Sequence, residues 1–364
     1  MDSSNNKNNN SLLRYLALLS LTFAGVYFLS SASSSSNPLL NLRRKSCHRA
    51  PPLYSKEIKF PIDELQQALN KASMPNKTVI IVVINKAYAE PPTTGKSESA
   101  MLDIFLESFW LGEDTRRLLD HLLLVAVDQI AYDRCIFKRL NCYKLETDGV
   151  DFAGEKLFMS QDFIKMMWRR TLLLLDVLKH GYSFIFTDAD VMWLRNPFPK
   201  LSNNRTIDLQ ISTDIFNGDV SSEKNLINTG FYYIKSNNKT ISLFETWYSR
   251  KDNSTGKKEQ DVLLELMLEG HFRQLNLIPR FLDTVFFSGF CTDSRDIREV
   301  ATVHANCCRS IDAKIHDLRG VLRDWVKFKT IVNRYKRLAM NNGTFPFKWS
   351  PHLGCLSSWN QTSA

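Results

Sequence analysis

The chain has 364 residues, of which 44% are hydrophobic and 23% charged, a composition typical of a globular protein rather than a disordered or fibrous one. Its formal net charge of +9 favours anionic partners such as nucleotide diphosphates, acidic polysaccharides or anionic membrane surfaces. No RNA- or DNA-binding motif accompanies that charge, so we expect no nucleic-acid partner.

One long apolar stretch stands near the N-terminus. Residues 12–30 would span a membrane as a helix rising about 1.5 Å per residue. We expect a cytosolic tail over residues 1–11, a transmembrane signal anchor over 12–30, a flexible Ser-rich and then basic stem over 31–61, and a lumenal domain over 62–364. A cleaved signal peptide is the alternative, because Ser30-Ser31-Ala32 resembles a small-residue cleavage site.

Sequons and cysteines agree with a secretory destination. The Asn-x-Ser/Thr sites lie at Asn76, Asn204, Asn238, Asn253, Asn342 and Asn360, all beyond the apolar stretch. Seven cysteines permit up to three disulfides in an oxidising compartment, with one left over, and the pairing is open. Adjacent Cys307 and Cys308 rarely pair with each other, so we expect each to bond to a separate partner. A zinc site that includes them is disfavoured because no second pair stands at zinc spacing.

The first half of the chain alternates between strand and helix patterns. We expect a helix at 63–72, a strand at 78–84, a helix at 98–111, a strand at 122–127, helices at 129–139 and 163–179, and a strand at 182–187. The continuous β-branched run at 78–84 is typical of a strand covered on both faces. Such alternation predicts right-handed crossovers and a largely parallel sheet.

The pattern changes beyond Pro197. We expect strands at 208–213 and 230–235, helices at 239–249 and 259–268, short strands near 274–278 and 300–304, and a final helix at 317–340. The polar loop at 214–228 between the first two strands has a length that suits substrate binding. The chain shows no internal repeat.

Two carboxylates follow the buried strand at 182–187. Asp188 and Asp190 lie one residue apart where that strand ends, the edge at which open α/β sheets bind ligands. Oxygen ligands on a tight turn suit Mg²⁺ or Mn²⁺ carrying substrate phosphates. We therefore interpret the pair as a metal and diphosphate site, with ordinary turn residues as the alternative.

Other polar residues would reach the same edge of the sheet. Asn85 and Asp128 end the first two strands, where they could bind a nucleotide base and ribose or serve only as turn residues. Asn228-Thr229-Gly230 opens a later strand, and its glycine allows either close backbone approach to sugar hydroxyls or a bulge.

Later residues could complete such a site. A neutral His304 imidazole could join a metal held by Asp190, or could be a structural histidine. Lys314 could neutralise a departing diphosphate, and Arg169 or Arg170 could contact phosphate or donor sugar. For each basic residue a plain surface charge is the alternative.

Taken together, four motifs carry a family resemblance. The runs Phe-Thr-Asp188-Ala-Asp190-Val-Met-Trp-Leu-Arg-Asn-Pro, Asn228-Thr-Gly-Phe, Gln260-Asp261-Val-Leu and Thr302-Val-His304-Ala-Asn-Cys-Cys stand in order between about 78 and 328. This arrangement resembles the plant nucleotide-diphospho-sugar transferase family, which includes extensin arabinosyltransferases and rhamnogalacturonan-II xylosyltransferases.

The resemblance implies a fold, an activity and a location. The fold would be GT-A-like: an α/β Rossmann-type mixed but largely parallel sheet flanked by helices, preceded by the transmembrane helix. The activity would be metal-dependent transfer of a sugar, with arabinose or xylose favoured, from a UDP-sugar to a cell-wall polysaccharide or glycoprotein. The location would be the Golgi membrane, with single-pass type II topology, and the cofactor would be Mn²⁺ or Mg²⁺.

The resemblance also implies roles for individual residues. Asp190 and His304 would bind the metal, and Asp188 would contact ribose or sugar as well as metal. By looser analogy with glycogenin-like enzymes, Asp214 and Asn228 would bind the donor sugar, and Arg170 would be the basic residue that precedes the Asp-x-Asp. Gln260 or Asp261 would lie at the reacting face, although Asp261 could instead satisfy backbone donors at a helix N-terminus.

Two other functions compete with a transferase. A strand followed by Asp-x-Asp also resembles haloacid-dehalogenase-type phosphatases, with Asp188 as nucleophile and Asp190 as acid/base. That fold normally begins with this strand, whereas here about 110 residues of α/β pattern precede it. A lumenal binding or scaffold protein without turnover is the non-enzyme alternative, and the Asp188, Asp190 and His304 set argues against it.

Overall fold

A computed structural model describes residues 63–92, 97–147, 149–156, 159–335 and 347–359. The expected tail, membrane span and stem, and Cys47 with them, lie outside the described residues. Within those described ranges, no helix is both long enough and apolar enough to cross a bilayer.

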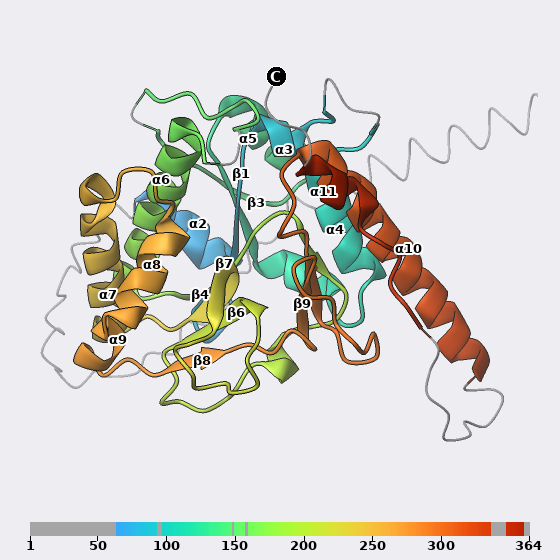
Figure 1. Cartoon of the computed structure of the whole chain (residues 1–364). Helices are drawn as coiled ribbons and strands as arrows, with labels where there is room; N and C mark the ends of the chain where they lie inside the picture. Colours follow the sequence, from blue (N-terminus) through green and yellow to red (C-terminus); the bar gives the residue numbers. More distant parts are fainter. Residues whose placement is uncertain (1–62, 93–96, 148, 157–158, 336–346, 360–364) are drawn as a thin grey trace, which may run out of the picture. The chain divides into compact units, whose positions relative to one another are not determined.

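A mixed seven-stranded sheet forms the centre of the fold (Figure 1). Its strands in spatial order are β3 (Asn141–Lys144), β2 (Leu122–Ala126), β1 (Thr78–Ile84), β4 (Ser183–Thr187), β7 (Leu226–Ile234), β6 (Leu209–Ile215) and β8 (Pro279–Phe281). The first four are parallel, β7 is antiparallel to both β4 and β6, and β8 is parallel to β6. The expected mixed, largely parallel α/β sheet is therefore confirmed.

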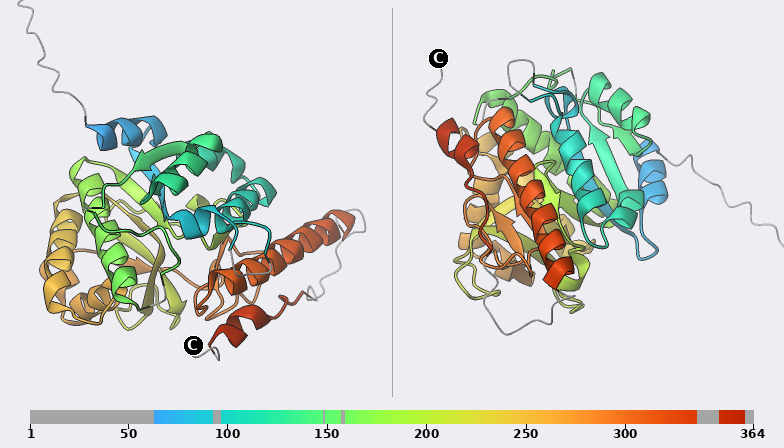
Figure 2. Two further views of the ribbon diagram at one scale, coloured as in Figure 1. Left: turned by 90° about the horizontal axis from the view of Figure 1, so that it is seen from above. Right: turned by 90° about the vertical axis from the view of Figure 1, so that its right-hand side faces the viewer.

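Helices cover both faces of this sheet, as Figure 1 shows. One face packs against α2 (Glu64–Ala72), α6 (Gln161–Lys179), α7 (Asn238–Ser249), α8 (Glu259–Leu268) and α9 (His271–Gln274). The other packs against α3 (Lys86–Ala89), α4 (Met101–Leu111), α5 (Gln129–Phe137) and α10 (Ile311–Tyr335). In Figure 2, α10 runs beside α4, and the Trp325 indole N–H donates to the Leu111 carbonyl at 3.0 Å.

The double cover explains the apolar sequence of β1. Ile80 and Val82 join the core under α4 and α10, whereas Val79 and Ile81 join the core under α2 and α6. Because successive strand residues point to opposite faces, a strand between two helix layers must be apolar at every position. Each such side chain contributes roughly 1.5–3 kcal/mol of burial free energy, which fixes the sheet that carries the site.

A second, three-stranded sheet stands beside the first. It contains β5 (Val191–Trp193), β10 (Thr302–His304) and β9 (Phe287–Gly289), in the order β5-β10-β9. Its antiparallel register sets His304 opposite Val191, directly after the turn that holds the two carboxylates. This small sheet brings a residue from the last third of the chain to the end of β4.

Some expected elements differ from the observed ones. The strand expected at 274–278 is wrong, because α9 ends there and the chain turns at Asn276, whose φ of 49° lies in the left-handed region that Asn tolerates. β7 begins at Leu226, so Asn228 lies within a strand rather than in the loop expected at 214–228. The final helix begins at Ile311, six residues before its expected start.

Three disulfides link the described cysteines. They join Cys135 to Cys142, Cys291 to Cys307, and Cys308 to Cys355. The adjacent Cys307 and Cys308 thus have separate partners, which confirms the expectation from sequence and removes both thiols as zinc ligands.

Candidate active site

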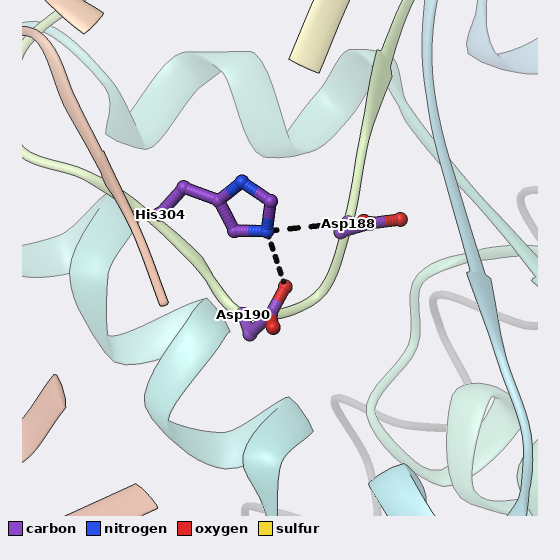
Figure 3. Close-up of side chains that lie close together, drawn as sticks. All are labelled: Asp188, Asp190 and His304. Atoms are coloured by element: carbon purple, nitrogen blue, oxygen red, sulfur yellow. Dashed lines mark ion pairs between the residues drawn. The ribbon is translucent and has the colours of Figure 1, made fainter. Parts of the chain in front are cut away.

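Asp188, Asp190 and His304 come together at the rim of the sheet (Figure 3). The two acids occupy the turn between β4 and β5, and the imidazole is the last residue of β10. Its Nε2 lies 3.3 Å from an Asp190 oxygen and 3.9 Å from an Asp188 oxygen. One ligand atom from each side chain lies within 4.8 Å of the other two. Two carboxylates and an imidazole are donors that suit Mn²⁺ or a similar divalent cation.

Asp190 is almost fully buried and is held as a carboxylate. Lys314, in the first turn of α10, places its Nζ 2.7 Å from the second Asp190 oxygen. Burial alone would raise the pKa of the Asp190 carboxyl, but Lys314 and His304 outweigh it and hold that pKa well below its usual range. The pKa of Lys314 is raised: burial opposes its charge, and the attraction of Asp190 is stronger. Both groups are therefore charged at neutral pH.

Arg170 connects the carboxylate turn to two helices. It projects from α6, and its two terminal nitrogens lie 2.9 Å from Asp188 and 2.6 Å from Glu259 of α8. Its guanidinium also lies over the Phe186 ring at 4.6 Å. Burial would lower the pKa of Arg170, but Glu259 and Asp188 raise it, so this buried cation is fully paired.

The pKa of Asp188 is raised, because the surrounding protein disfavours its charge and the Asp190 carboxylate adds to that effect. Arg170 opposes this rise, and Asp188 keeps 32% of its side chain exposed toward the cavity. The two acids of the turn thus differ: one is buried and strongly neutralised, and the other is open to a ligand.

A cluster of polar amides stands next to the carboxylate turn. The same Asp214 oxygen accepts from the Asn228 amide at 2.9 Å and from the Asn306 amide at 2.7 Å. We call Asp214, Asn228 and Asn306 the amide cluster. Paired amides and a carboxylate offer both donors and acceptors, the combination that recognises hydroxyl groups.

Gly230 lets β7 approach the site closely. A Cβ at this position would lie 2.3 Å from His304 Cε1 and 2.9 Å from an Asp188 oxygen. The Asp188 amide also donates to the Gly230 carbonyl at 2.7 Å. The pairing of β6 and β7 shifts register here, so the glycine serves a close approach within an irregular strand.

Gln260 and Asp261, neighbours in the first turn of α8, have different surroundings. The Gln260 side-chain oxygen accepts from the Thr229 amide at 3.0 Å, and Gln260 lines the cavity. An Asp261 oxygen accepts from the Lys258 amide at 3.2 Å, as a capping residue does, and Asp261 is not among the residues that line the cavity. The structure therefore brings Gln260, but not Asp261, to the other site residues.

Asn85 and Asp128 both cap short helices. Asn85 lines the cavity, but its amide donates to the Phe152 and Gly154 carbonyls at 2.8 and 3.0 Å. Asp128 accepts from the Ala131 amide at 2.8 Å and lies in a separate hollow with Lys144 and Glu146. The strand-end positions are as expected, yet β2 lies two strands from β4, so Asp128 does not meet the carboxylate turn.

A cavity of about 330 Å³ joins these groups. Of the residues expected from sequence, those that line it are Asn85, Arg170, Asp188, Asp190, Asp214, Asn228, Gln260, His304 and Lys314. Glu259 and Asn306 also line it and were not expected, although each stands within two residues of an expected one. Trp359 and Arg309 line it too.

Comparison with known proteins places the chain. Residues 117–318 match the family model described as nucleotide-diphospho-sugar transferase. An uncharacterized Arabidopsis thaliana protein is 58% identical over 83% of this chain and 86% of its own length. The chain belongs to the nucleotide-diphospho-sugar transferase family.

More distant relatives have described activities. A beta-arabinofuranosyltransferase of Arabidopsis thaliana is 26% identical over 63% of this chain and 42% of its own length. A UDP-D-xylose:L-fucose alpha-1,3-D-xylosyltransferase of the same plant is 27% identical over 53% of this chain and 46% of its own length. Mouse xyloside xylosyltransferase 1 is a similar solved structure, with 14% identity, a TM-score of 0.37, and coverage of 63% of this chain and 98% of that one.

Proposed function

We propose that this protein is a GT-A-type glycosyltransferase that moves a pentose, arabinose or xylose, from a UDP-sugar to a cell-wall glycan or glycoprotein. The observation that carries the proposal is the convergence of Asp188, Asp190 and His304 in one polar cavity of a family member. The pentose rests on the relatives named as arabinofuranosyl- and xylosyltransferases. Family membership leaves a phosphatase without support.

The donor set fits a divalent cation. Asp188, Asp190 and His304 would hold Mn²⁺ or Mg²⁺, because one oxygen of each carboxylate and one imidazole nitrogen lie within 4.8 Å of one another, close enough to bind the same cation. When bound, the cation would neutralise negative charge on the donor diphosphate. Lys314 supplies a second positive charge at the same place, through its contact with Asp190.

The protein's own groups would stabilise the transfer. The acceptor hydroxyl oxygen bonds to the anomeric carbon, the bond from that carbon to the diphosphate breaks, its electron pair leaves with UDP, and the hydroxyl proton is released to solvent. Negative charge therefore grows on the diphosphate, and the fixed charge of Lys314 is preorganised to oppose it. The amide cluster would hold the donor sugar, and Gln260 would lie at the reacting face.

We also propose a Golgi location with type II topology, in which residues 12–30 anchor a lumenal domain. Three disulfides among the described cysteines support an oxidising compartment. The apolar stretch supports the anchor.

The test is metal-dependent turnover of the donor. Full-length protein is incubated with UDP-xylose or UDP-arabinose and Mn²⁺ without acceptor, and released UDP is measured. Asp190→Asn keeps the side-chain shape and removes the charge that the cation needs, so we expect UDP release to disappear. The matched control is Asp252→Ala, because that acid is 86% exposed and does not line the cavity. Full UDP release by the Asp190→Asn protein would refute the proposal, and so would no release by the unaltered protein with either donor.

A further inference from the structure

The end of the described chain returns to the cavity and is fastened there. The short helix α11 (Leu353–Ser358) follows α10 in Figure 1. The Cys308–Cys355 disulfide ties it to the segment after His304. A buried Asp317 carboxylate of α10 accepts from the Gly354 and Cys355 amides at 3.2 and 2.7 Å. α11 is therefore held without any help from the residue that follows it, Trp359.

Trp359 is fixed in place although it is exposed. Its indole N–H donates to the Cys307 carbonyl at 2.7 Å, and the Arg309 guanidinium lies 3.9 Å from the ring centre. The residue nevertheless keeps 44% of its surface exposed, at the cavity wall. An oriented aromatic ring that is left partly open to solvent beside a polar cavity is suited to bind a ligand with an apolar face.

Arg309 adds hydrogen-bond donors beside that ring. No carboxylate pairs with its guanidinium anywhere in the part of the chain that the structure describes, and the side chain is exposed. Its five N–H groups are directional donors, which suit hydroxyl or carboxylate oxygens of a ligand. The ring and the guanidinium therefore offer an apolar face and polar donors side by side.

The position of this pair along the cavity indicates which substrate it meets. Cys307, which accepts the Trp359 N–H, follows Asn306 of the amide cluster in sequence. The Asn306 oxygen accepts from the Cys291 amide at 3.0 Å, and Cys291 is the disulfide partner of Cys307. Trp359 thus stands at the wall next to the groups proposed to hold the donor sugar, where an acceptor hydroxyl must arrive.

We propose that Trp359 and Arg309 form the acceptor subsite, in which a sugar ring of an acceptor glycan stacks on the indole and its oxygens accept from the guanidinium. This rests on the proposed function, because it takes the cavity to hold a UDP-sugar. Sugar C–H groups carry partial positive charge, which the negative face of an indole attracts, and the rigid ring loses little entropy on binding.

The test measures acceptor and nucleotide binding separately. Arabinan, xylan and galacturonan oligosaccharides are titrated by calorimetry into the full-length protein with UDP and Mn²⁺, and UDP is titrated alone with Mn²⁺. We expect Trp359→Ala to weaken oligosaccharide binding about tenfold, the size of a lost aromatic stack, without changing UDP affinity. The matched control is Trp110→Ala, because Trp110 is 57% exposed, has the Arg116 guanidinium 4.0 Å from its ring, and does not line the cavity.

A second variant distinguishes the loss of sugar stacking on the aromatic ring from a disturbed structure of the segment around Trp359. Trp359→Phe keeps a smaller aromatic face and loses the N–H that bonds to the Cys307 carbonyl, so it should retain more oligosaccharide affinity than Trp359→Ala. The inference is overturned if Trp359→Ala binds oligosaccharides as the unaltered protein does, if it weakens UDP instead, or if the unaltered protein binds none of the three. Donor hydrolysis without acceptor depends on Asp190 and not on Trp359, so its loss or survival reports on the proposed function alone.

Discussion

Replacing Gly230 with alanine tests whether the carboxylates and the imidazole act as one site. The added methyl would lie 2.3 Å from His304 Cε1, whereas carbon atoms in contact stand about 3.5 Å apart. The imidazole must withdraw by roughly 1 Å, because the methyl is also confined by Asp188 and Asn228 oxygens at 2.9 Å. Metal ligands tolerate displacements of only about 0.2 Å, so the cation should lose its third donor.

We expect a loss of about 10- to 100-fold in Mn²⁺ affinity, comparable to the effect of disturbing the groups that orient metal ligands. Overpacking should also lower the free energy of unfolding by about 1–3 kcal/mol, which leaves the protein folded. Calorimetric titration of Mn²⁺ in the presence of UDP measures the first effect, and urea unfolding measures the second.

The control is Gly320→Ala within α10. Its nearest neighbours would lie 3.8 and 4.0 Å from the new Cβ, so it should bind Mn²⁺ normally, and the helix should gain up to about 1 kcal/mol. Unchanged Mn²⁺ and UDP affinity in the Gly230→Ala protein would show that His304 is not a ligand, and the reasoning would fail.

Two further predictions concern the ion pairs. Glu259→Ala leaves the buried guanidinium of Arg170 with Asp188 as its remaining partner, so urea unfolding should show that the free energy of unfolding falls by about 3–5 kcal/mol. Glu259→Gln keeps an acceptor oxygen for the guanidinium and should be less destabilising. Equal losses in the two variants would contradict this reasoning. His180 donates to the Asp63 carboxylate at 2.9 Å; burial lowers its pKa, but hydrogen bonds to Asp176 and Asp63 raise it overall, above 6.5. The stabilisation that protonated His180 contributes to the fold is therefore fully present below pH 6.5, the pKa of an unfolded histidine, and is lost as pH rises through the higher folded pKa. The pKa of Asp63 is lowered, so the stabilisation that its carboxylate contributes is present above pH 3.8, the pKa of an unfolded aspartate. Thermal melts should therefore show His180→Gln to be more destabilising near pH 5.5 than near pH 9, and a pH-independent difference would refute this.

The sequence predicted the elements whose own residues determine them. The strand at 78–84 and the helix at 259–268 coincide with β1 and α8, because one is uniformly β-branched and the other has acidic residues in its first turn followed by a run of strong helix formers. β3 was missed because Asn141–Lys144 is a polar, half-exposed strand at the edge of the described sheet, next to β2. β5 was missed because its three residues carry no periodicity, and its partner β10 lies far along the chain.

The position of a site residue was predictable where a strand ends at it. It was not predictable where the position depends on which hydrogen bond or ion pair the side chain forms. Asp188 and Asp190 follow a buried strand directly, so their position at the rim was predictable. The end of a strand also predicted that Asp128 would lie with these acids, but the Asp128 carboxylate caps the helix α5 by accepting from the Ala131 amide. No sequence pattern indicates that Glu259 is a buried site residue, because its burial depends on an ion pair with Arg170 of another helix.

The division of the site between distant parts of the chain has a consequence for biosynthesis. Both carboxylates leave the ribosome with β4 and β5, whereas His304 and Lys314 come much later, with β10 and α10. A chain truncated before β10 would carry two neighbouring acids with neither the imidazole nor the ammonium that balances Asp190. The complete centre can therefore assemble only after the segment that carries β10 and α10 has been synthesised, and the Cys291–Cys307 and Cys308–Cys355 disulfides both lie within that last part of the chain.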